Sequence, residues 1–127
     1  MLAEDTVTTC EKPIESAEDL SSIAFGFMGS KALFAGLHVD IFSMLADGPK
    51  SAEDLAKAAD IPINRVAILT TALASIGLLI IADDRKIRNS PAAQSFLSKE
   101  SRYDFGDYLR YQIDQQMYPF LLQLNAV

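Results

Sequence analysis

The sequence has 127 residues, the length of one ordinary domain, and half of them are hydrophobic, so the chain can bury a core without metal ions or disulfide bonds. Seventeen acidic side chains against eleven basic ones give a net charge of -6, which argues against nucleic-acid binding because that function draws on clustered lysine and arginine. The single cysteine, Cys10, excludes a disulfide framework within the chain.

We expect residues 1–15 to form a flexible tail, because they are rich in Thr and Glu and show no hydrophobic periodicity. The first residues carry acids where a signal peptide carries bases. The longest apolar run, residues 76–82, is far shorter than the roughly 20 residues that span a bilayer. These features predict a soluble, cytoplasmic protein without a membrane partner, with residues 16–127 forming one domain.

Two long amphipathic helices are predicted directly after the tail. Ser16 followed by Asp19 forms a capping box that starts the first helix. The apolar positions behind this cap recur at the spacing of one helical face: Leu20, Ile23, Ala24, Phe27 and Met28. Gly29 and Ser30 are expected to break or bend the helix, and the same spacing predicts a second helix from about Ser30 to Ala46. The two stripes are too wide to cover each other, so a further surface must cover the outer face.

The middle of the chain predicts a helix-turn-helix followed by a β-hairpin. Ser51 opens a second capping box, and Pro62 suits the first turn of the next helix. Gly77 is placed to end that helix in the left-handed conformation. Residues 78–81 and 86–88 are β-branched or alternating around a polar turn, as in a short hairpin. This order of elements is typical of a winged helix.

The last part of the chain predicts a short helix and then a long one. Ser90 before Pro91 is a cap followed by a first-turn proline. From about Asp104 the apolar residues recur at three- or four-residue intervals: Leu109, Ile113, Met117, Phe120, Leu121 and Leu124. Pro119 should kink this helix about one turn before itself. The expected fold is therefore mainly α, a helical domain that contains a winged helix-turn-helix with a small β-hairpin.

Several phrases of the sequence resemble the N-terminal dimerisation domain of SAM-dependent small-molecule O-methyltransferases. Residues 33–49 (LFAGLHVDIFSMLADGP) and 51–56 (SAEDLA) are similar to the family's Leu-Gly-Ile-Phe-Asp-like phrase, its Gly-Pro and its Thr-Ala-Glu-Glu-Leu-Ala-like phrase. Residues 65–78 look like its arginine-containing helix that ends in Gly-Leu, and residues 89–92 like its Leu-Thr-Pro-Ala step. The chain departs from the pattern at His38, where the family has glycine, and carries only one arginine in the helix.

The resemblance covers about residues 20–124 and implies a module that pairs with a second copy. Family members run on into a SAM-binding catalytic domain, so the resemblance implies that this chain holds no catalytic, cofactor or metal residues of its own. A catalytic domain would follow covalently or act as a separate partner. The implied function is dimerisation and roofing of the substrate pocket in an O-methyltransferase-like enzyme of small-molecule, secondary metabolism. A winged-helix transcription regulator is the alternative, followed by a stand-alone ligand- or partner-binding protein.

Candidate residues for pairing lie on the outer faces of the first two helices. The predicted homodimer interface comprises Leu20, Ile23, Phe27, Met28, Phe34 and Leu37. The last helix is expected to add to it, and Tyr111, Gln115 and Tyr118, one helical turn apart, are the candidates for the pocket roof. His38, the one histidine, has no evident partner for general-base chemistry and is expected to be structural.

The residues that could serve DNA, cofactors or metals form weak patterns. The basic residues of the predicted wing, Arg85, Lys86 and Arg88, have Asp83 and Asp84 beside them, which partly cancel their field. The polar face of the preceding helix has one positive charge among Asn64, Arg65, Thr70, Thr71 and Ser75. The sequence contains no glycine-rich nucleotide fingerprint, and the acids stand at helix caps rather than in a metal-binding spacing.

Overall fold

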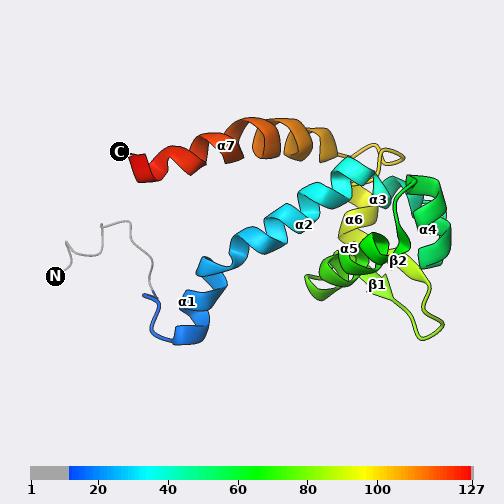
Figure 1. The fold of residues 1–127 in the computed structure, drawn as a ribbon, viewed down its shortest axis with the longest axis horizontal. Helices are drawn as coiled ribbons and strands as arrows, with labels where there is room; N and C mark the ends of the chain where they lie inside the picture. Colours follow the sequence, from blue (N-terminus) through cyan, green and yellow to red (C-terminus); the bar gives the residue numbers. More distant parts are fainter. Residues whose placement is uncertain (1–11, 127) are drawn as a thin grey trace.

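The computed structural model describes residues 12–126 and shows a mainly helical domain with a small β-hairpin (Figure 1). Almost all of the expected N-terminal tail, including Cys10, lies outside the described residues. The predicted fold class, a helical domain with a small hairpin, is confirmed.

The elements follow one another along the chain in a simple order. They are α1 (Ala17–Ala24), α2 (Gly26–Val39), α3 (Ile41–Met44), α4 (Ala52–Ala59), α5 (Ile63–Ser75), β1 (Leu79–Ile81), β2 (Ile87–Asn89), α6 (Pro91–Phe96), the π-helix η2 (Tyr108–Met117), α7 (Tyr118–Leu121) and the 3-10 helix η3 (Leu122–Ala126).

The helix starts follow from the caps that the sequence predicts. The Ser16 hydroxyl accepts a hydrogen bond from the Asp19 N–H at 3.0 Å, and Ser51 accepts one from Asp54 at 3.1 Å. Ser90 accepts one from the Ala93 N–H at 3.2 Å. Each cap satisfies a backbone donor that has no partner within its own helix.

The two N-terminal helices differ from the prediction in where they are interrupted. The break falls at Phe25, between α1 and α2, and not at Gly29 and Ser30, which continue α2. The predicted helix from Ser30 to Ala46 is also wrong, because Asp40 takes a left-handed conformation with φ 66° and separates α2 from α3. Aspartate tolerates that conformation better than most residues, so it can end a helix without glycine.

The hairpin is short and is attached to the helices at one edge. β1 and β2 pair antiparallel, with Leu79 opposite Asn89 and Ile81 opposite Ile87. Lys50 forms an additional bridge to Ile87, which ties the segment before α4 to the hairpin. Gly77, with φ 87°, makes the turn from α5 into β1, as predicted.

The core forms where the C-terminal half of α2 meets α3, α4, α5, the hairpin and α6. Its fully buried members include Leu37, Phe42, Leu55 and Leu73. α2 passes close to these elements at Gly36, where an added Cβ would lie 3.1 Å from atoms of both Leu73 and Phe42. Position 36 therefore requires glycine because a side chain would crowd the core. Its backbone conformation, which is helical, does not require glycine.

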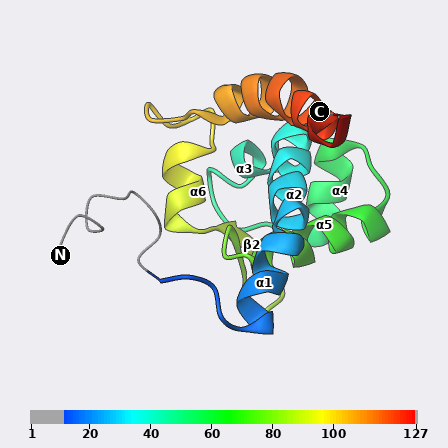
Figure 2. The ribbon, with the colours of Figure 1, turned by 90° about the vertical axis from the view of Figure 1, so that its left-hand side faces the viewer.

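Two segments extend away from this core on the same side (Figure 1). We call residues 17–32, which comprise α1 and the first half of α2, the N-arm, and residues 115–124 the C-arm. The π-helix η2 runs beside α2, and Figure 2 shows the C-terminal segment passing over the end of α2. The ends of the two arms lie apart in Figure 1.

The last helical segment differs in type from the single α-helix that the spacing predicts. Its first part is a π-helix, and α-helical geometry resumes at Tyr118, immediately before Pro119. Pro119 therefore stands in the first turn of α7, directly after the π-helix. The change of helix type falls at Tyr118, and the kink expected about one turn before Pro119 stays a prediction.

Candidate functional site

The N-arm exposes an unusual amount of apolar side chain. No residue of α1 is buried. Leu20 and Ile23 are 61% and 65% exposed, and Phe25, Phe27 and Met28 are each more than half exposed. Isolated apolar residues on a surface are ordinary, but a contiguous set of this kind marks an interaction site.

The C-arm has the same character. No residue of α7 is buried. The large exposed apolar side chains of the C-arm are Met117, Phe120, Leu121, Leu122 and Leu124. The chain carries no charged side chain from Gln115 onward. The two arms therefore present apolar surfaces that the described part of the chain does not cover.

The structure divides the residues predicted for the interface into two groups. Leu20, Ile23, Phe27 and Met28 lie on the exposed N-arm. Phe34 and Leu37, 4% and 1% exposed, lie in the core of the chain itself. The assignment of those two residues to an outer face is wrong, because Phe34 packs against Tyr118 and Leu37 belongs to the buried core cluster.

A polar seam joins α2 to the π-helix and sets the direction of the C-arm. Asp114 is its centre: its Oδ1 lies 2.6 Å from Lys31 Nζ, and its Oδ2 lies 2.9 Å from His38 Nε2. Burial works to raise the pKa of Asp114, but the hydrogen bonds and charges of Lys31 and His38 outweigh it and lower the pKa below its ordinary value. His38 thus has a structural role, as expected from the sequence, because it links α2 to the π-helix through Asp114.

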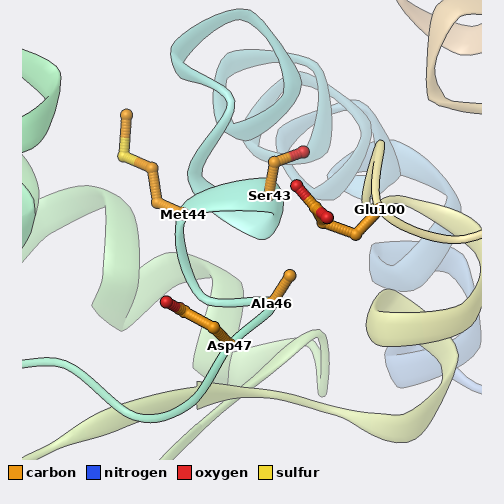
Figure 3. A pocket seen from close by; sticks show the side chains of 5 residues that line it. All are labelled: Ser43, Met44, Ala46, Asp47 and Glu100. Carbon is orange, nitrogen blue, oxygen red and sulfur yellow. The ribbon is translucent and has the colours of Figure 1, made fainter.

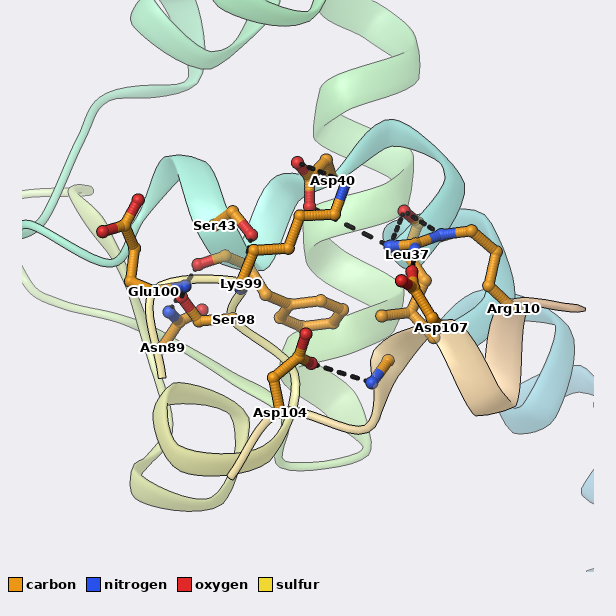
Figure 4. A network of polar contacts seen from close by, with 12 residues as sticks. Leu37, Asp40, Ser43, Asn89, Ser98, Lys99, Glu100, Asp104, Asp107 and Arg110 are labelled. Atoms are coloured by element: carbon orange, nitrogen blue, oxygen red, sulfur yellow. Dashed lines mark hydrogen bonds and ion pairs between the residues drawn. The ribbon is translucent and has the colours of Figure 1, made fainter. Parts of the chain in front are cut away.

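Arg110, which the sequence did not single out, holds the start of the π-helix against the end of α2. Its guanidinium is buried and donates from Nε and Nη2 to the Leu37 carbonyl at 3.1 and 2.8 Å (Figure 4). It also pairs with Asp107 and lies 4.0 Å from Asp40 Oδ1. The Leu37 carbonyl also accepts the Asp40 N–H at 3.1 Å, and a cation at this place complements the negative end of the α2 dipole.

The residues predicted for a pocket roof do not share one face. Tyr111, 49% exposed, and Gln115 point to the surface. Tyr118 instead packs edge-on against Phe34 at 6.3 Å, with Lys31 Nζ 4.6 Å from its ring centroid. Hydrogen bonding from i to i+5 gives the π-helix more residues per turn, so α-helical spacing does not apply between Tyr111 and Tyr118.

The surface that would contact DNA in a regulator is only weakly basic. Arg85, Lys86 and Arg88 are exposed on the hairpin, and Asp84 accepts the Lys86 N–H at 3.0 Å within the same turn. On α5, Thr70 is buried and donates its hydroxyl to the Val66 carbonyl, so it does not belong to a polar outer face.

A hollow beside α3 holds acidic side chains but has no metal-binding geometry. It is lined by Ser43, Met44, Ala46, Asp47 and Glu100. Figure 3 shows Glu100 reaching toward Ser43 while Asp47 points away from both. Asp47 is paired with Lys50 at 3.0 Å, and the hydrogen bond and charge of Lys50 lower its pKa. Among residues 12–126 no three metal-binding side chains converge.

α1 and α2 together also satisfy a simple criterion for a membrane span. Residues Ala17–Val39 form one helical stretch of 23 residues, long and apolar enough to cross a bilayer by length and composition. The core helix of a soluble protein or a signal sequence passes the same test, so this is weak evidence. The expectation that no membrane is involved stays a prediction.

These features define a mainly helical domain with two uncovered apolar arms, and comparison with known proteins gives its family. Residues 21–99 match the family model of the O-methyltransferase dimerisation domain. The match covers more than half of the chain, and the chain belongs to this family. The resemblance stated from the sequence is confirmed, and membership implies self-association.

Curated relatives include bacterial methyltransferases. The chain is 35% identical over 105 residues to the N,N-dimethyltransferase OxyT of Streptomyces rimosus, covering 82% of this chain and 30% of OxyT. It is 30% identical over 107 residues to the tetracenomycin polyketide synthesis 8-O-methyl transferase TcmO of Streptomyces glaucescens, covering 84% of this chain and 31% of TcmO. The chain thus spans about a third of the length of these relatives.

Solved structures show the same fold. PigF with SAH superposes with a TM-score of 0.80 at 28% identity, over 90% of this chain and 37% of PigF. Human N-acetylserotonin methyltransferase in complex with SAM gives a TM-score of 0.81 at 22% identity, over 93% of this chain and 35% of that protein. At that identity the second likeness concerns the fold alone.

Proposed function

We propose that the chain acts as the homodimerisation module of an O-methyltransferase-like enzyme of small-molecule metabolism and performs no catalysis alone. The observation that carries the proposal is the exposure of the N-arm and the C-arm. Their apolar side chains face solvent in the single copy. Burying apolar surface stabilises an assembly by about 25 cal/mol for each square ångström removed from water. A second copy of the chain is the partner that a dimerisation domain requires.

The chemistry would belong to the remaining two thirds of a parent protein. OxyT and TcmO are named as methyltransferases, and the PigF and human structures contain SAH and SAM. By likeness to them, the parent would bind SAM in another domain and methylate a small acceptor. We also propose a cytoplasmic location. We propose in addition that the chain has no nucleic-acid partner, since the hairpin and α5 present little net positive charge.

A contribution to the substrate pocket is part of the same proposal. Tyr111 and Gln115 are exposed on the π-helix and free to contact a ligand held by a neighbouring domain. Tyr118, packed on Phe34 and Lys31, would support the helix from behind and not touch the ligand. π-helical turns occur often at functional sites, which favours this segment for a binding role.

The proposal is tested with one variant in the N-arm and one matched variant outside it. Ile23→Glu places a charge on α1, while Ile81→Glu places the same charge on an exposed position of β1, 43% exposed. Sedimentation velocity should show that Ile23→Glu shifts the chain to monomer and Ile81→Glu leaves the dimer intact. Equal behaviour of the two variants would contradict the assignment of the N-arm.

The regulator alternative is tested with the wild-type chain. Fluorescence anisotropy with random-sequence DNA duplex should show no binding at physiological salt, and calorimetry should show no SAM binding by this chain. Salt-sensitive duplex binding would favour the DNA-binding function. Measurable affinity for SAM would contradict the placement of the cofactor in another domain.

A further inference from the structure

The turn between α3 and α4 contains the one Asp-Gly dipeptide of the sequence, Asp47–Gly48. In such a dipeptide the backbone nitrogen of glycine can attack the aspartate carboxyl group, because glycine has no side chain that obstructs the approach. Both residues lie outside helices and strands. The Asp47 side chain is 80% exposed and points away from Ser43 and Glu100 (Figure 3). The carboxyl group that would react is therefore open to water.

The surroundings of Gly48 leave room for a ring to close. Its φ is 141°, and a Cβ added there would lie more than 4 Å from every atom beyond its two chain neighbours. A five-membered ring that includes the Gly48 nitrogen and the Asp47 side chain therefore meets no packed neighbour on that side of the glycine.

Asn89–Ser90, which could close the same kind of ring, lies in the opposite environment. These residues are 8% and 7% exposed, and Asn89 donates from Nδ2 to the Phe42 carbonyl at 2.8 Å. The nitrogen that would attack, that of Ser90, donates to the Leu78 carbonyl at 3.0 Å. Packing therefore protects Asn89, whereas the fold leaves Asp47 open.

The reaction at Asp47 has two steps, and water is its only other reagent. In the first, the Gly48 nitrogen bonds to Asp47 Cγ, a Cγ–O bond breaks, and the amide hydrogen leaves with the carboxyl hydroxyl as one water molecule. In the second, water opens the cyclic imide. Attack at Cγ restores aspartate, whereas attack at the main-chain carbonyl carbon of Asp47 leaves the chain running through Cγ, which is isoaspartate.

Two contacts within the turn oppose the first step. Lys50 Nζ donates to Asp47 Oδ1 at 3.0 Å, and this hydrogen bond and the lysine charge lower the pKa of Asp47. Near neutral pH the turn therefore holds less of the protonated carboxyl group, which is the form that can lose hydroxyl. The Gly48 N–H donates to the Leu45 carbonyl at 3.2 Å, which engages the hydrogen of the attacking nitrogen.

We propose that Asp47–Gly48 is a site of spontaneous isoaspartate formation, and that Lys50 and the Leu45 carbonyl keep the reaction slow in the folded chain. Of the two contacts, the one with Lys50 can be removed by a side-chain substitution, so its effect on the rate can be measured separately.

The modification would act on the link between this turn and the hairpin. Isoaspartate adds one carbon to the main chain shortly before Lys50, which donates its N–H to the Ile87 carbonyl at 2.9 Å and accepts the Ile87 N–H at 2.8 Å. The Ile87 amide should therefore exchange its hydrogen faster in the modified fraction. Residue 47 lies outside both arms, so the modification should leave self-association unchanged.

Peptide mapping after prolonged incubation at physiological temperature measures the reaction. Electron-transfer fragmentation gives ions specific to isoaspartate and assigns them to one position. The wild-type chain should accumulate isoaspartate at position 47 and none at position 89. A synthetic peptide of residues 45–51 should react faster than the folded chain, because it lacks the contacts of the turn. A folded chain that reacts as fast as this peptide would contradict the effect of those contacts.

Substitution of Lys50 tests its role. At about pH 6, Lys50→Met should raise the rate about threefold, because the protonated fraction of a carboxyl group well above its pKa increases with that pKa. Lys50→Arg keeps the charge and should stay near the wild-type rate. The matched control is Lys57→Met, which removes an exposed lysine of α4 and should leave the rate unchanged.

The Asp47→Asn background separates the charge of Lys50 from its effect on the shape of the turn. Asparagine closes the same ring but releases ammonia and needs no protonated carboxyl group, so Lys50→Met should leave its rate nearly unchanged. Equal acceleration in the two backgrounds would overturn the role given to the lysine charge. Absence of isoaspartate at position 47 in both the wild type and Lys50→Met would overturn the site itself.

Discussion

At the scale of single residues, Arg110 is the one charged residue that is buried in the described chain. Its side chain is 6% exposed, and both of its hydrogen bonds to α2 end on one carbonyl oxygen, that of Leu37. Asp40 Oδ1 is buried and has no hydrogen-bond partner in the range 12–126. The guanidinium lies 4.0 Å from this oxygen, and Lys99 Nζ lies 3.6 Å from the other oxygen of the same carboxylate. Removing a buried charge from such a network lowers the free energy of unfolding, because the polar groups that it contacted are left buried without a partner.

Replacing Arg110 should therefore destabilise the fold. Arg110→Met keeps much of the side-chain volume but removes the donors, and we expect a loss of roughly 2–4 kcal/mol in the free energy of unfolding by urea. Arg102→Met is the control, since Arg102 is exposed and only stacks near Tyr103; it should change stability by less than about 0.5 kcal/mol. Similar losses for the two variants would contradict a specific role for Arg110.

Asp114 gives the chain a pH dependence whose sign follows from its surroundings. Its pKa is lowered in the folded state because Lys31 and His38 outweigh the effect of burial. A carboxyl group with a lowered pKa stabilises the fold fully above its ordinary value near 3.8, and this contribution is lost as the pH falls through the lowered value.

The Asp114→Asn variant isolates that contribution. Urea unfolding should show the wild type more stable than the variant at pH 5 and above, with the difference shrinking as the pH falls below about 4. A difference that stays constant down to pH 2 would show that the carboxylate charge contributes nothing to the seam.

At the scale of elements, two identical capping sequences stand in different settings. Ser-Ala-Glu-Asp begins both α1 and α4, and the serine cap is formed in each. α4 contributes Leu55 to the core, whereas no residue of α1 is buried. The same local interaction should therefore have different consequences for the fold as a whole.

Substituting the two capping serines measures this difference. Ser51→Ala should lower the free energy of unfolding by about 1 kcal/mol, because α4 forms with the core. Ser16→Ala should leave unfolding of the dilute monomer nearly unchanged but speed hydrogen exchange of the α1 amides. An equal loss of global stability in both variants would show that α1 belongs to the cooperative fold of the single chain.

The elements also show which features local sequence could predict. The serine caps, the turn at Gly77 and the hairpin follow from signals within a few residues, and all are present. The helix break at Phe25, the left-handed Asp40 and the π-helix were not predicted from the apolar spacing. The π-helix packs along α2, and its Arg110 lies 4.0 Å from Asp40, so both features involve segments distant in sequence that local signals do not show. Arg110 was missed for the same reason, since its acceptor lies 73 positions away.

The candidate site was predicted in part. Apolar spacing identified the exposed residues of α1, but the same spacing placed Phe34 and Leu37 on the outer face, although they are buried. Periodicity shows which side of a helix is apolar and does not show how many partners cover it. Only the fold distinguishes the half of α2 that faces the core from the half that projects beyond it.

At the scale of the whole molecule, one compact core carries two projecting apolar arms. The core from α3 to α6 holds most of the buried residues, and the arms hold a large share of the exposed apolar ones. An arrangement of this kind is poorly suited to a single copy in water, because large apolar patches are uncommon on monomers. The family match to a dimerisation domain accounts for it in the simplest way.

Sedimentation equilibrium of the wild-type chain over a wide concentration range tests this account most directly. The chain has a mass of 13.9 kDa, and the account predicts that the measured mass rises with concentration and levels off at twice this value. The α1 amides should become protected from hydrogen exchange over the same range. A mass that stays at that of one chain at the highest concentration, with α1 unprotected, would contradict it.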